Sequence, residues 1–154
     1  MSAVLLTLHS LLRWAVLLLL VGRAGRSLTG WLQRTPWVGA DRTLGLVTLI
    51  CVDVQLLVGL VLYGMYSPAV QAAQADPGAA MADPALRFWF VEHASIMILA
   101  VVAAHIGQVM AKRGKTDLLQ HRAAAIGAIV TLLLILVGIP WPWRESVGRA
   151  LLPF

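Results

Sequence analysis

Four apolar stretches restrict the fold of this 154-residue sequence more than any other feature. They cover residues 4–22, 44–66, 88–110 and 123–139. The hydrocarbon core of a bilayer is about 30 Å thick and is crossed by ~20 residues of α-helix, so each stretch is long enough to span it. Because 60% of the residues are hydrophobic and only 12% are charged, we predict an all-α fold in which residues 1–154 form a single integral membrane domain with four transmembrane helices.

The charged residues lie mainly between these stretches. The first connection is basic, with Arg23, Arg26, Arg34 and Arg42, and so is the third, with Lys112, Arg113, Lys115 and Arg122. The second is mostly acidic, with Asp76, Asp83 and Arg87. Cytoplasmic loops are enriched in Lys and Arg, which predicts cytoplasmic first and third connections and two extracytoplasmic termini. The net charge of +5 therefore reflects topology, and no nucleic-acid partner is expected.

The connections predict how the helices are arranged. Short connections favour an up-down-up-down bundle, in which the first and third helices run in the same direction and face each other diagonally. Residues 27–42 carry Trp31 and Trp37 and are predicted to lie along the cytoplasmic interface. Residues 67–87 are interrupted by prolines, so this outer loop has room for a short helix but not for another span. Pro140 is expected to end the last helix.

Two histidines are predicted to share one depth in the membrane. His9 lies five residues into the first stretch and His93 five residues into the third, which places both about 7.5 Å below the outer surface. A b-type heme held by one histidine on each side fits this geometry. Small-residue helix packing around hydrogen-bonded histidines explains the same spacing.

A second heme site is a weaker hypothesis. His105 follows His93 by twelve residues, which rotates it about 120° around the helix and away from the face of His93. It lies at the same cytoplasmic level as His121, which starts the fourth helix beside Arg122. A histidine at a helix boundary beside an arginine is more often simply solvated, which is the favoured interpretation of His121.

Other polar residues fall inside the predicted spans, where ionisable groups are costly and mark functional sites. Arg13 and Asp53 lie at matching depths near the bilayer midplane, about 14 Å deep, and can form either an ion pair that fixes helix register or part of a proton path. Gln55 belongs to a polar stripe on the second helix, on the side opposite Asp53, which makes a homo-oligomer or a larger membrane complex plausible. Glu92 is a candidate for proton uptake or a solvated side chain.

Four segments resemble a family of small four-helix bacterial membrane proteins labelled cytochrome b-like. They are Leu8-His9-Ser10-Leu11-Leu12-Arg13-Trp14, the run from Gln55 to Tyr63, Val91-Glu92-His93, and Gly138-Ile139-Pro140-Trp141-Pro142. The resemblance implies a bacterial inner (cytoplasmic) membrane location and puts His9, Arg13, Gln55, Glu92, His93 and His121 on recurrent polar positions. Asp53 and His105 look particular to this chain.

Three functions follow as hypotheses. The first is an electron-transfer protein that binds one heme b near the outer face through His9 and His93, with Arg13 at a propionate, and that exchanges electrons with quinol or a redox partner protein. The second is a heme-free accessory or scaffold subunit of a larger complex. A metal permease ranks third, because one cysteine and scattered methionines make a poor soft-metal site. The sequence carries no nicotinamide or flavin fingerprint and no hydrolase-like arrangement, which leaves enzymatic activity open.

Overall fold

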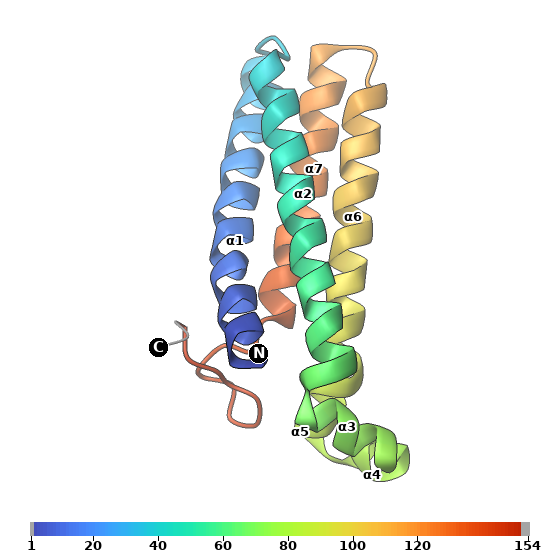
Figure 1. Ribbon diagram of the computed structural model, residues 1–154. Helices are drawn as coiled ribbons and strands as arrows, with labels where there is room; N and C mark the ends of the chain where they lie inside the picture. The colour runs from blue at the N-terminus through green and yellow to red at the C-terminus, as the bar shows by residue number, and fades with distance from the viewer. Residues whose placement is uncertain (1, 152–154) are drawn as a thin grey trace.

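The computed structural model of the protein describes residues 2–151. In that part of the chain, four helices are long and apolar enough to cross a membrane, at Ala3–Gln33, Gly39–Tyr66, Pro84–Arg113 and Asp117–Gly138. They pack side by side as a bundle (Figure 1). The chain is therefore a multi-pass membrane protein with four candidate spans, as the apolar stretches predict.

The first two helices are longer than the apolar stretches that predict them. Helix α1 spans Ser2–Gln33, and α2 spans Gly39–Val61 and continues as the π-helical turn η1, Leu62–Tyr66. Residues 27–42, predicted to lie along the cytoplasmic interface, do not form a separate segment, since only residues 34–38 interrupt the helices. No proline precedes Pro36 here, and Ser27 is buried in the bundle, so α1 continues until Arg34 turns the chain with a φ of 54°.

An ion pair fixes this tight turn. The Arg26 guanidinium donates twice to the buried Asp41 carboxylate, through Nε to Oδ1 and through Nη2 to Oδ2 at 3.1 Å. The same carboxylate accepts the Val38 backbone N–H at 2.9 Å and so satisfies one free donor at the start of α2. The basic connection is thus a structured hairpin between two spans.

The outer connection folds into three short helices. These are α3 at Pro68–Ala75, α4 at Pro77–Ala82 and α5 at Pro84–Arg87. Each begins with a proline, and the preceding side chain (Ser67, Asp76 or Asp83) caps it, a combination that favours helix starts. The third span continues through the π-helical turn η2, Phe88–Glu92, into α6, His93–Arg113, and α7 follows at Asp117–Gly138.

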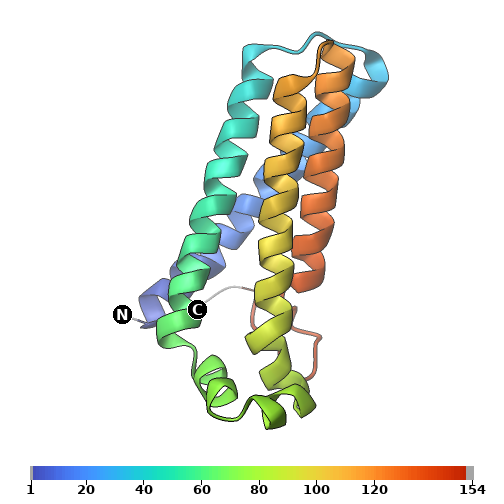
Figure 2. The ribbon, with the colours of Figure 1, turned by 90° about the vertical axis from the view of Figure 1, so that its right-hand side faces the viewer.

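The bundle has the predicted up-down-up-down order. Helix α1 packs against α2 and α7, and α6 packs against the same two helices, so α1 and α6 are parallel and diagonal. The start of α1 and the segment after α7 lie at the end of the bundle that carries α3, α4 and α5, and the basic turns lie at the opposite end (Figures 1 and 2). The assignment of the terminal end to the outside of the membrane stays a prediction from the charge pattern.

Small residues bring α6 and α7 into close contact in the half of the bundle far from the termini. A Cβ built on Gly107 would lie 2.6 Å from the Gly127 Cα, and the reverse holds for Gly127. Ala100, Ala104 and Ala128 are buried nearby. Small residues let backbones approach closely in membrane helix pairs, which makes this half compact.

Candidate functional site

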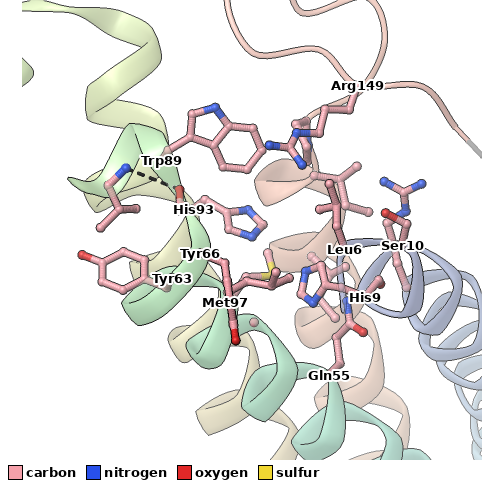
Figure 3. Close-up of a pocket in the computed structure, with 18 of the residues that line it drawn as sticks. Leu6, His9, Ser10, Gln55, Tyr63, Tyr66, Trp89, His93, Met97 and Arg149 are labelled. Atoms are coloured by element: carbon pink, nitrogen blue, oxygen red, sulfur yellow. Dashed lines mark hydrogen bonds between the residues drawn. The ribbon is translucent and has the colours of Figure 1, made fainter. Parts of the chain in front are cut away.

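His9 and His93 meet between the diagonal helices. Their ring centres are 6.5 Å apart and the ring planes are inclined by 69°. Figure 3 shows the two imidazoles pointing toward one another from α1 and from the start of α6. The structure therefore brings together the two histidines whose depths the sequence matched.

A backbone carbonyl orients the His93 ring. Its Nδ1 lies 2.9 Å from the Gly138 carbonyl oxygen at the end of α7. A carbonyl oxygen only accepts hydrogen bonds, so Nδ1 carries the proton and Nε2 keeps a free lone pair. Ring N–H contacts of this kind are the usual outer shell of a metal-ligating histidine. The rings of Trp89 and Phe88, from η2, pack 5.6 and 5.7 Å from the ring centre of His93.

The His9 ring rests against α2. The Gln55 side-chain amide donates to the His9 backbone carbonyl at 3.0 Å, and Gly59 lies beside the ring, since a Cβ there would be 3.1 Å from His9 Cε1. His9 Nδ1 and Gln55 Oε1 are both buried and have no hydrogen-bond partner within the described residues. Buried polar atoms normally have partners, so this pair is chemically unsatisfied in the protein alone.

The two histidines line a cavity with two lobes of about 450 Å³ each, which is within the range of cofactor and small-molecule sites. The terminal lobe lies toward the start of α1, and its lining includes Arg13 and Arg149. Figure 3 shows Arg149 above the histidines. The lateral lobe lies between α2 and α6 and is mostly apolar. The lobes share His9, Val16, Gln55, Gly59, Tyr63, His93, Met97 and Ile135.

The segment after α7 borders the terminal lobe through Pro140 and Arg149. The Leu151 carbonyl accepts hydrogen bonds from Arg13 Nη2 at 2.6 Å and from Trp14 Nε1 at 3.0 Å. The Arg149 guanidinium stacks 4.3 Å over the Trp89 ring. Partial burial lowers the pKa of Arg149 from its usual value, but guanidinium groups in proteins stay protonated. Two positive charges therefore lie at this end of the cavity.

Arg13 does not form the ion pair that matching depths allow with Asp53. Its guanidinium turns to the C-terminal segment instead. The Asp53 carboxylate is 3.6 Å from His105 Nε2, and both side chains are substantially exposed on the outside of the bundle. Glu92 pairs with Arg87 at 2.8 Å. Of the predicted polar set, Arg13 and Gln55 line the cavity with the histidines, and Asp53 and Glu92 do not.

The structure also separates the two histidines of the weaker second-site hypothesis. His105 faces outward beside Asp53. His121 is fully buried at the other side of the bundle, with its ring edge-on to Trp37 at 4.8 Å and its Nε2 3.4 Å from the Pro36 carbonyl. Each histidine has different neighbours, so they do not form one site, and His121 is not the solvated residue that a helix boundary suggests.

Sequence reasoning missed a buried polar network in the half far from the termini. Arg23 is 4% exposed and donates to Gln108 Oε1 at 2.6 Å and to the Gly45 carbonyl at 3.4 Å. Hydropathy assigns Arg23 to a connection, because the apolar stretch ends at residue 22. Arg149 was also not predicted as a site residue. The aromatic residues of η2 could have indicated it, because its guanidinium stacks over the Trp89 ring.

No protein-family model, no curated protein and no solved structure matches the chain. The resemblance to cytochrome b-like proteins therefore rests on the sequence segments alone. Within residues 2–151, no three or more histidine, cysteine, aspartate or glutamate side chains cluster in a way that could hold a metal ion.

Proposed function

We propose that this chain is a membrane electron-transfer protein that binds one heme b between α1 and α6, with His9 and His93 as the iron ligands. The observation that carries the proposal is the 6.5 Å separation of two facing imidazole rings. Two imidazoles that shared one metal ion would have ring centres up to ~6.4 Å apart, from a metal–nitrogen bond of about 2.0 Å and ~1.2 Å between each nitrogen and its ring centre. The two values agree.

The surroundings of the histidines also suit a heme. The Gly138 carbonyl keeps the Nε2 lone pair of His93 free for a metal. Arg13 and Arg149 line only the terminal lobe and suit the two carboxylates at one edge of the macrocycle. The rest of the cavity is mostly apolar. A bound heme would supply a one-electron redox centre, and the protein's part is to hold, orient and shield it.

The charge pattern predicts on which side of the membrane the cavity lies. The basic turns lie at the end of the bundle opposite α3, α4 and α5 (Figure 1), and the cavity is lined by residues of α1, η1 and η2 near those short helices. Together with the positive-inside rule, this supports a cavity near the outer face of a bacterial cytoplasmic membrane. Quinol in the bilayer or a redox partner protein outside it would then exchange electrons with the site.

The alternative is a heme-free accessory subunit of a larger membrane complex, and one observation favours it. The exposed pair of Asp53 and His105 lies where lipid would surround the helices, and ionisable residues in spans normally face protein or water. A second copy of this chain or another subunit would cover the pair. A metal permease ranks below both, because the described residues bring together two histidines and no larger metal-binding cluster.

The test is the reduced-minus-oxidised visible spectrum of protein purified from heme-replete cells. We expect the bands of a b-type heme in the wild type, their loss in His9→Ala and in His93→Ala, and their retention in the control His105→Ala. A colourless wild type would overturn the proposal in favour of the heme-free accessory role. Bands that survive both substitutions would show that His9 and His93 are not the iron ligands.

A further inference from the structure

The lateral lobe of the cavity opens toward the region that the bilayer would occupy. Leu60 on α2 and Ile98 on α6 line it, and each is 46% exposed on the outside of the bundle. Val91 belongs to the same mouth. Large apolar side chains at the mouth of a cavity between two spans meet lipid tails rather than water. A molecule dissolved in the bilayer can therefore reach the lobe without leaving the membrane.

The inner end of the lobe offers two unsatisfied hydrogen-bonding atoms. Gln55 Oε1 is an acceptor, and His9 Nδ1 is a donor whenever the other ring nitrogen of His9 binds a metal. The bond from Gln55 to the His9 backbone carbonyl holds the two residues together. The nearby Tyr63 hydroxyl already donates a hydrogen bond to the Phe90 carbonyl at 2.9 Å. A ligand here needs a group that can both give and accept hydrogen bonds.

The charge of the lining narrows the ligand class. Among residues 2–151, no arginine or lysine lines the lateral lobe, and Arg13 and Arg149 line only the terminal lobe. An anionic lipid headgroup would therefore lack a counter-charge. A neutral ring with oxygen atoms and an apolar tail suits the lobe. A quinone accepts from His9 Nδ1–H, and a quinol also donates to Gln55 Oε1.

We propose that the lateral lobe binds the ring of a membrane-dissolved quinone or quinol, held by Gln55 and His9, with its tail leaving the protein between α2 and α6. This inference rests on the proposed function, because it identifies the molecule with which the proposed heme site would exchange electrons. The cationic terminal lobe takes the carboxylate edge of the heme, and the mouth at Leu60, Val91 and Ile98 is left for the bilayer ligand.

The experiment measures retention of a decyl-tailed dimethoxybenzoquinone by the full chain in phosphatidylcholine nanodiscs. Two variants test the site: Ile98→Trp narrows the mouth, and Gln55→Met removes the acceptor. Leu99→Trp is the matched control, since Leu99 neighbours Ile98, is 56% exposed and lines neither lobe. A lost hydrogen bond of about 1 kcal/mol weakens binding several-fold, so we expect affinity to fall about fivefold to tenfold in Gln55→Met, to fall at least as far in Ile98→Trp, and to match the wild type in Leu99→Trp.

The outcomes separate this inference from the proposed function, because retention is measured on heme-loaded protein and on protein from heme-limited cells. Saturable retention that both site variants weaken supports the quinone site, even if the spectra show no heme. Three results would overturn it. The first is equal retention of the quinone by the wild type and the three variants, and the second is no retention by a protein that shows a histidine-dependent heme spectrum. The third is displacement of the quinone by an alcohol that has the same tail but no ring, at the concentration at which the unlabelled quinone displaces it. Gln55→Met keeps the test decisive if Ile98→Trp does not fold.

Discussion

The buried Arg23–Gln108 pair provides a sharp test of how the bundle is held together. Replacing Gln108 with Leu leaves a guanidinium that is 4% exposed with one hydrogen bond, the 3.4 Å contact to the Gly45 carbonyl. Replacing Arg23 with Met leaves the Gln108 amide oxygen without its 2.6 Å partner. Replacing both residues fills the space with apolar groups and leaves neither side chain unpaired.

The magnitudes follow from the charge and burial of the pair. Hydrogen bonds to charged groups contribute ~1.5–3 kcal/mol, so we expect Gln108→Leu to lower the free energy of unfolding by about 2–3 kcal/mol. Arg23→Met leaves a neutral group unsatisfied and is expected to cost ~1–2 kcal/mol. The double variant is expected close to the wild type. The two single losses and an unchanged double variant correspond to a coupling energy of about 3–5 kcal/mol, well above the ~0.6 kcal/mol average for polar pairs between membrane helices.

The assay is reversible unfolding in mixed micelles of rising SDS content, followed by tryptophan fluorescence, for the wild type and the three variants. A double-mutant cycle then isolates the coupling between the two residues. Additive losses, with a coupling below about 0.5 kcal/mol, would refute the reasoning, because they would mean that Arg23 finds equivalent partners when Gln108 is absent.

Three further predictions follow from close contacts. Gly59→Ala is expected to displace the His9 ring, since the added Cβ would be 3.1 Å from it, and to weaken heme binding several-fold in a hemin titration of protein from heme-limited cells; unchanged affinity would contradict this. Gly107→Ala is expected to destabilise the bundle by more than 1 kcal/mol in the SDS assay, by overpacking, whereas the control Gly64→Ala meets nothing within 4 Å and should cost less than about 0.5 kcal/mol. Asp41→Asn is expected to raise the rate of proteolysis at residues 34–38, because it weakens the ion pair and the cap; an unchanged rate would show that the turn does not depend on them.

The sequence predicts the bundle and the histidine pair because both depend on rules that act over whole helices. Span length follows from bilayer thickness, and the short connections make the first and third helices parallel. Two histidines at the same depth on parallel, diagonal helices then have to lie at one level. The 6.5 Å separation of the His9 and His93 ring centres agrees with this expectation.

The errors arise where hydropathy does not mark a helix end. The apolar stretch stops at residue 22, but α1 continues to Gln33, because a long side chain such as Arg23 can stay helical when it finds partners inside the bundle. Depth alone also could not choose a partner for Arg13. The choice depends on the segment after α7, whose carbonyl at Leu151 lies beside α1, and such long-range contacts leave no local pattern.

The π-helical turns were not predictable either, although they shape the cavity. Residues of η1 and η2 line both lobes, through Tyr63 and Tyr66 on one side and Trp89 and Phe90 on the other. Turns of this type occur frequently at functional sites. Their residues read as ordinary apolar or aromatic helix, so the widened backbone becomes visible in the structure alone.

The most direct test of the central claim, that His9 and His93 together ligate one heme, is the ferric electron paramagnetic resonance spectrum of the heme-loaded protein. Two imidazole ligands give low-spin iron, so we expect a low-spin signal in the wild type and in His105→Ala. Any heme that His9→Ala or His93→Ala retains should be high-spin. A high-spin signal in the wild type, or a low-spin signal that persists in both single variants, would contradict the claim.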